Sequence, residues 1–140
     1  MASLIYNSAM RDEATGAVDF DTDSFKVMLV TSAYVENKDT HTKRSDVTNE
    51  VVGTGYTAGG NAVTVTVAAV DTANDRVDIT FATVTWPTST ITARKAVYYK
   101  SRGGLATADE IIAVNDFGAD VPTVAGTFTL NASTVRKSNP

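Results

Sequence analysis

The sequence predicts an all-β protein: a jelly-roll or β-sandwich-like single domain over residues 1–140, with one or two short helices. Its composition supports this, because 22 threonines and 18 valines stand among 140 residues. Such β-branched side chains suit a pleated, half-buried sheet better than a helix. Apolar and polar residues also alternate repeatedly between turn-forming clusters, which is typical of short antiparallel strands.

Two short helices are expected in the first third of the chain. Residues 8–14 predict one or two helical turns, capped within residues 7–8 and ended by Gly16. Residues 42–47 predict a second helix with Thr42 as its N-cap.

The clearest strand signal is a hairpin formed by residues 62–68 and 76–82. In the first segment Val63, Val65 and Val67 share one face, and an equivalent alternation runs through the second. The connecting residues 71–75 are turn formers. Four further strands are predicted at residues 25–32, 91–101, 111–117 and 127–134.

Residues 25–30 form a nearly continuous apolar run, which predicts a central strand covered on both faces. The polar tail, residues 133–140, is expected to be flexible or ordered only by a partner.

Composition excludes several classes of function. The chain has no cysteine and a single histidine, so disulfides, thiolate metal sites and clusters of histidine ligands are not expected. A net charge of −4 argues against nucleic acid and anionic membranes as partners. No targeting segment or membrane span is recognisable, so synthesis in a cytoplasm is expected. We assign no catalytic, cofactor-binding or metal-binding residue, and we expect no enzyme and no cofactor.

Two motifs invite a ligand-binding interpretation. Residues 19–23 place three aspartates at a spacing of two, as at the start of a calcium loop, but Ser24 and Val30 occupy the positions of its glycine and bidentate glutamate. An acidic loop is the expected alternative. Residues 53–60 are rich in glycine, but Ala58 replaces the third glycine of a dinucleotide fingerprint. A glycine-rich turn between strands is therefore predicted.

Catalytic and sugar-binding sites also need particular side chains. His41 is the only imidazole, and it lies in a polar segment where a solvated or capping role is expected rather than that of a general base. Paired carboxylates stay open, because their separation depends on the fold. Trp86 with Tyr98 or Tyr99 could form a carbohydrate-binding platform if these rings are exposed together.

Charge is unevenly distributed along the chain. Residues 79–108 contain no acidic residue, whereas residues 1–23 carry five acidic residues against one arginine. This segregation favours surfaces shaped for protein partners, unless the charges intermix once the chain folds. The basic residues concerned are Arg94, Lys95, Lys100 and Arg102, together with Arg136 and Lys137 in the tail.

Three stretches, residues 20–34, 43–60 and 86–100, are similar to small virion proteins of tailed phages. The whole chain most resembles the head decoration, or cement, proteins of that group. The resemblance covers about half the chain and consists of sequence texture rather than a catalytic signature, and the family offers no active-site residues to carry over.

The resemblance implies a jelly-roll subunit on the outside of an icosahedral capsid, bound to a major capsid protein with an HK97-like fold. It also implies bridging of neighbouring subunits, strand addition to capsid sheets and self-association, with a dimer favoured. The six basic residues are then expected to contact the capsid or a second copy of the chain. A tail, connector or fibre component and a carbohydrate-binding module remain the alternatives.

Overall fold

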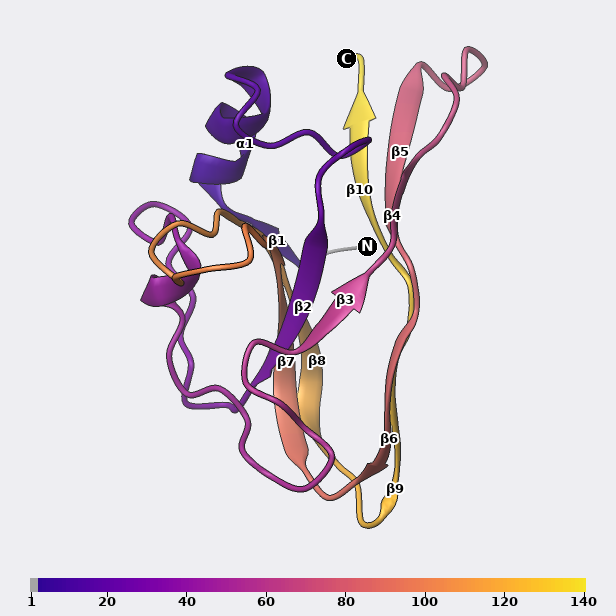
Figure 1. Cartoon of the computed structure of the whole chain (residues 1–140). Helices are drawn as coiled ribbons and strands as arrows, with labels where there is room; N and C mark the ends of the chain where they lie inside the picture. Colours follow the sequence, from indigo (N-terminus) through magenta and orange to yellow (C-terminus); the bar gives the residue numbers. More distant parts are fainter. Residues whose placement is uncertain (1–2) are drawn as a thin grey trace.

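The computed structural model describes residues 3–140 and is mostly β-structure, which confirms the predicted fold class (Figure 1). One α-helix and one short 3-10 helix, η1, accompany ten strands in the described residues. The elements in chain order are β1 (Leu4–Ile5), α1 (Asn7–Ala14), β2 (Phe25–Val30), η1 (Arg44–Asp46), β3 (Asn61–Val63), β4 (Val65–Val67), β5 (Arg76–Phe81), β6 (Val84–Ser89), β7 (Thr92–Lys100), β8 (Ile111–Pro122), β9 (Gly126–Leu130) and β10 (Ser133–Ser138).

The strands form two layers. One is a five-stranded sheet of order β1-β8-β7-β2-β3, antiparallel throughout. The other is a long ribbon in which β5 leads into β6 and β9 leads into β10, with β10-β5-β4 at one end and β6-β9 at the other. This ribbon runs along the right of Figure 1, and the turns into β7 and out of β8 join it to the first sheet.

The main hydrophobic core lies between these layers, and alternation along β2 explains how it forms. Phe25, Val27 and Leu29 enter the main core with Phe81, Trp86 and Phe128 from the ribbon, whereas Met28 and Val30 enter a second cluster on the opposite face. Residues 31–47 contribute Tyr34 and Val47 to that second cluster. The five-stranded sheet is therefore covered on both faces, as the apolar run over residues 25–30 predicts.

The predicted hairpin is confirmed where β4 pairs with β5, with Val65 opposite Phe81 and Val67 opposite Ile79. Residues 61–63 instead pair with β2 in the other sheet. The chain therefore passes from one layer to the other between Val63 and Val65. The alternation of valine and threonine continues unchanged through this point, so the sequence pattern does not reveal the crossing. The strands predicted at residues 25–32, 91–101 and 111–117 correspond to β2, β7 and β8, and β8 extends five residues further.

The prediction of one strand over residues 127–134 is wrong, because β9 ends at Leu130 and β10 begins at Ser133. The tail was expected to be flexible or ordered only by a partner, but residues 133–138 form β10, which pairs with β5 of the same chain along its whole length. Strand β6 was not predicted, because Pro87 removes a ladder donor and weakens the strand signal. Proline is tolerated there because β6 has a register shift between Trp86 and Ser89.

The first predicted helix is confirmed, but its N-cap is Tyr6, which has no capping side-chain bond. It ends as expected beside Gly16, which adopts a left-handed φ of 79°. The second helix is shorter than predicted. Only Arg44–Asp46 form a 3-10 turn, its N-cap is Lys43 rather than Thr42, and the Asp46 carboxylate accepts hydrogen bonds from the backbone N–H of both residues.

Candidate functional site

Each of the six basic residues predicted to meet a partner has a carboxylate of the same chain beside it. Lys95 pairs with Glu36 and also donates to the carbonyl of Tyr34, and Lys137 pairs with Glu13. The other four pairs, by nitrogen–oxygen distance, are Arg94–Asp116 at 2.6 Å, Lys100–Asp23 at 2.8 Å, Arg102–Glu110 at 2.6 Å and Arg136–Asp78 at 2.7 Å.

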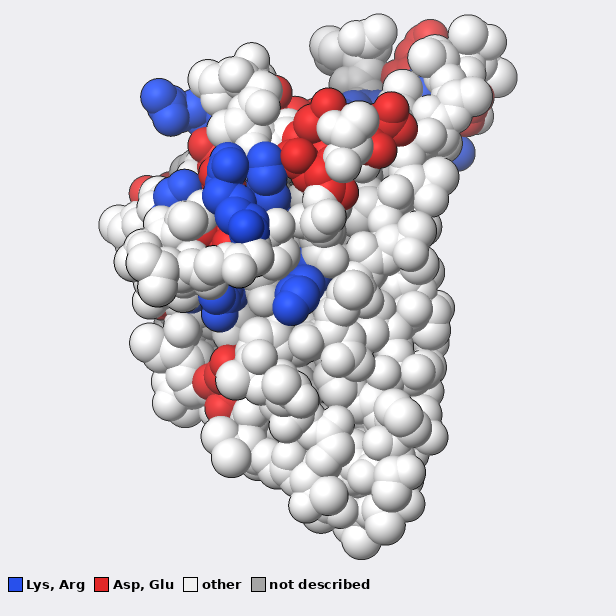
Figure 2. Space-filling model, in the orientation of Figure 1, with Lys and Arg blue, Asp and Glu red and all other residues white. Residues whose placement is uncertain are grey.

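These pairs show that basic and acidic residues which are separated along the chain lie next to one another in the folded structure. Figure 2 shows Lys and Arg side chains next to Asp and Glu side chains over the upper part of the visible face. Contact of the six residues with a capsid or a second copy stays a prediction. Any such contact would compete with an internal ion pair, which limits the affinity that the contact could add.

The most buried charges lie where residues 101–110 fold over the sheet. Glu110 accepts bonds from Arg102 and lies 3.5 Å from Lys43, while Asp109 lies 2.7 Å from Arg44. Burial raises the pKa of Glu110, but the bonds from Arg102 and the attraction of Lys43 outweigh it, so its pKa is lowered overall. The Glu110 carboxylate is therefore stabilised in its ionised form, and its bonds together with those of Asp109 anchor this loop to the rest of the chain.

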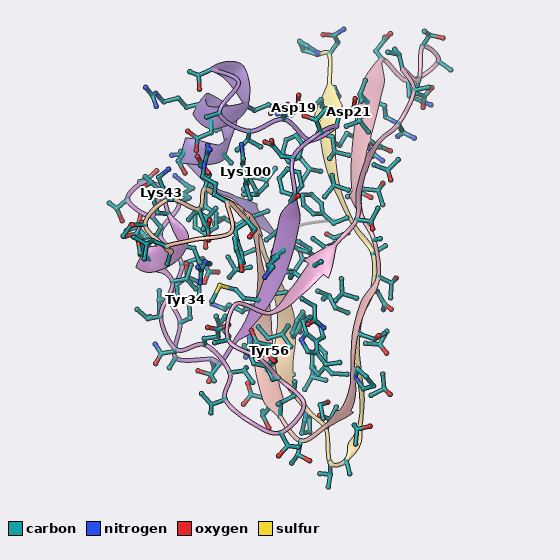
Figure 3. The ribbon with its side chains drawn as sticks, in the orientation of Figure 1. Asp19, Asp21, Tyr34, Lys43, Tyr56 and Lys100 are labelled. Carbon is teal, nitrogen blue, oxygen red and sulfur yellow. The ribbon has the colours of Figure 1, made fainter. Side chains whose placement is uncertain are left out.

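The aspartates of residues 19–23 organise their own loop (Figure 3). The Asp19 carboxylate accepts the Asp21 N–H, and the Asp23 carboxylate accepts the Asp19 N–H and pairs with Lys100. Within residues 3–140 no group of three or more His, Cys, Asp or Glu residues is placed to hold a metal ion. These hydrogen bonds and the ion pair make residues 19–23 an acidic loop that is held by its own side chains.

The glycine-rich segment is a turn before β3, as predicted, and the side chains of Tyr56 and Glu50 hold it in place. Tyr56 accepts the Leu29 N–H at 2.9 Å and donates to Glu50 at 2.7 Å, and Glu50 also accepts the Gly59 N–H. Burial, followed by the bond to Glu50, raises the pKa of Tyr56. No sequence motif marks this pairing, since Glu50 belongs to a polar loop.

His41 lies at the edge of a cluster of aromatic hydroxyls. Its Nδ1 atom is 3.0 Å from the hydroxyl of Tyr34 and accepts the backbone N–H of Asn37, and the Tyr34 hydroxyl is 2.7 Å from that of Tyr6. The imidazole thus closes a turn and has no serine or threonine nucleophile among these hydrogen-bond partners. This agrees with the capping role predicted for it.

The condition for a carbohydrate platform, joint exposure of three aromatic rings, is not met. Trp86, Tyr98 and Tyr99 are 1%, 0% and 2% exposed. Trp86 stacks on Tyr56 and meets the edge of Phe128 within the main core. Trp86 and Tyr98 point into the main core and Tyr99 points into the second cluster, so the three rings pack the interior and present no surface to a sugar.

The sheet topology leaves two uncharged edge strands in the ribbon, β9 and β4. Strand β9 pairs with β6 on one side, and no strand of the described chain pairs with its other side. Beside it lies a hollow of about 330 Å³, in which Phe117 and Val121 of β8 face Phe128 and Leu130 of β9. Strand β4 likewise ends its sheet on the opposite side of the ribbon. Neither strand carries a charged residue.

No helix in residues 3–140 is both long and apolar enough to cross a membrane. Comparisons with family models, curated proteins and solved structures found no match to this chain.

Proposed function

We propose that this chain is a structural virion protein that binds the outer surface of an icosahedral phage capsid and bridges neighbouring major capsid protein subunits. The resemblance of residues 20–34, 43–60 and 86–100 to phage decoration proteins supports this proposal. So does the β-sandwich-like fold, which presents edge strands that a partner can extend.

The observation that carries the proposal is the unprotected edge of β9. Proteins normally shield an edge strand with charged residues, proline or a covering segment, because its unpaired N–H and C=O groups attract other strands. Residues 126–130 contain neither charge nor proline, and their outer edge borders the hollow lined by Phe117 and Leu130. A strand from another chain could pair with this edge and place an apolar side chain in the hollow.

The stabilising effect would follow from linkage. A protein that binds the assembled shell, and not its dissociated subunits, stabilises the shell by RT ln(1 + [L]/Kd) at each site, about 2.7 kcal/mol at a hundredfold excess over Kd. Because an icosahedral shell repeats the site many times, modest individual contacts would brace the whole particle against the pressure of packaged DNA.

The deciding experiment is the copy number of this protein relative to the major capsid protein in purified virions. Near-stoichiometric abundance would support decoration of the head, because only the shell offers that many equivalent sites. A few to some tens of copies would assign the chain to the tail, connector or fibre. Complete absence from particles would overturn the structural role.

A further inference from the structure

Three segments of the chain, residues 51–70, 79–93 and 121–135, contain no Asp, Glu, Lys, Arg or His. All 12 basic and all 16 acidic residues lie elsewhere. Charged residues make up 20% of the sequence, so three such long uncharged segments are a marked departure from even mixing.

The fold brings these three segments together. Strand β6 of the second segment pairs with β9 of the third, and Asn61 Nδ2 of the first donates to the carbonyl of Thr85 in β6 at 3.0 Å. Thr54 also pairs with Thr90, and the Thr123 N–H donates to the carbonyl of Ile91 at 2.7 Å. We call the surface of these segments the charge-free region. Figure 2 shows it as the nearly all-white lower part of the visible face.

The exposed side chains of the charge-free region are mostly hydroxyl-bearing or small and apolar. Thr66, Thr85 and Thr129 face outward from β4, β6 and β9. At the end of the molecule Val52 and Val124 are 95% and 83% exposed, and they border a shallow hollow of about 470 Å³. Threonine and valine lose far less on leaving water than a charged group does.

Charge depletion has a known counterpart in protein interfaces, whose buried centres are poor in charged residues. Soluble domains otherwise contain about 25% charged residues overall, most of them at the surface. The charge-free region also contains the two uncharged edge strands of the ribbon, β4 and β9, on its opposite sides. A partner that covered the region would remove an exposed apolar surface and two reactive strand edges together.

We infer that the charge-free region is the docking face of this protein, and that it seats on an uncharged surface of the shell subunits rich in small apolar and hydroxyl side chains. This inference rests on the proposed function. A two-fold contact with a second copy would cover one patch, whereas the region includes both edges of the ribbon and the end between them. Neighbours on several sides, as in a lattice of shell subunits, match that extent. The six basic residues lie outside this region, so their contact with a partner is a separate prediction that this inference does not require.

The test uses shells that lack this protein and measures binding by co-sedimentation. Thr66→Lys and Thr129→Lys each place a charge at an exposed position of the region and should weaken binding at least tenfold. Thr129→Gln adds similar length without charge and should bind as the wild type does. Thr107→Lys is the matched control, because Thr107 is exposed in a loop among charged residues. Circular dichroism verifies that each variant folds.

The outcomes separate the inference from the proposed function. If the wild type binds shells, and the lysine variants at positions 66 and 129 both bind as tightly as the wild type, the inferred docking face is wrong while the proposed function stands. If the wild type does not bind shells, the proposed function and the inferred docking face are both wrong. If sedimentation equilibrium instead reveals a dimer that Thr129→Lys dissociates, the region is covered by a second copy, and the shell is not its occupant.

Discussion

At the scale of single residues, buried polar groups decide how the long loops sit on the sheet. Tyr56 is the clearest case, because its hydroxyl joins the backbone of β2 at Leu29 to the carboxylate of Glu50. Glu50 in turn holds the N–H of Gly59 at 2.6 Å. One hydroxyl therefore links a central strand, a polar loop and the glycine-rich turn before β3.

Tyr56→Phe should destabilise the fold by about 1–3 kcal/mol, because it leaves the Leu29 N–H without an acceptor and removes one of the two hydrogen bonds that the Glu50 carboxylate accepts. Urea unfolding followed by circular dichroism measures the change. Glu50→Gln keeps an acceptor oxygen and should cost less. Equal stability of Tyr56→Phe and the wild type would show that water replaces the hydroxyl.

At the scale of elements, a backbone contact fixes the pairing of β3 with β2. Gly60 precedes β3, has a φ of 73°, and approaches β2 so closely that a Cβ atom there would lie 1.8 Å from the Val27 carbonyl oxygen. Backbone atoms cannot move aside without breaking the ladder. Glycine is thus required both by conformation and by space.

Gly60→Ala should lower the free energy of unfolding by more than about 4 kcal/mol, or prevent folding. Gly103→Ala is the matched control, because Gly103 has a φ of 80° with nothing within 4 Å of its added Cβ. Its cost should be limited to about 1–2 kcal/mol from the left-handed backbone. Similar losses in both variants would mean that conformation alone, and not the close approach, restricts position 60.

At the scale of the whole molecule, the structure is divided by charge. The upper part of the face in Figure 2 carries ion pairs such as Lys100–Asp23 and Arg102–Glu110, and the lower part belongs to the charge-free region. Like that of Glu110, the carboxylates of Asp23 and Asp46 are stabilised in their ionised form. Desolvation raises the pKa of Asp23, but the bonds from Lys100 and from the Asp19 N–H outweigh it and lower that pKa overall. Bonds from the Thr42 and Lys43 N–H groups lower the pKa of Asp46.

Stability should consequently fall in acid. A carboxylate whose pKa is lower in the folded state stabilises the protein above its unfolded pKa, near 4, and this contribution is lost as pH falls through the folded value. We expect urea midpoints to be nearly constant from pH 7 to about pH 5 and to decline progressively below about pH 4. Glu110→Gln should flatten the decline. A midpoint unchanged at about pH 2.5 would contradict this assignment.

Several elements could be predicted from sequence because their signals are local. The helix before Gly16, the apolar strand β2 and the turn between β4 and β5 depend on neighbouring residues, and all three are present. The break between β9 and β10 was missed because Asn131 and Ala132, although both are depleted in strands, interrupt a strand-like sequence for only two positions. Strand β6 was missed for a different reason, because Pro87 argues against a strand.

The sequence by itself determined that this is a β-rich chain, and the three uncharged segments can be read directly from it. Only the tertiary structure decided that Arg94 and Arg102 are paired, that Trp86 and Tyr98 are buried, and that the uncharged segments meet on one surface. The physical reason is distance along the chain. Strand propensity is a property of adjacent residues, whereas charge pairing, burial and surface composition arise from contacts between segments that pairing of distant strands brings together.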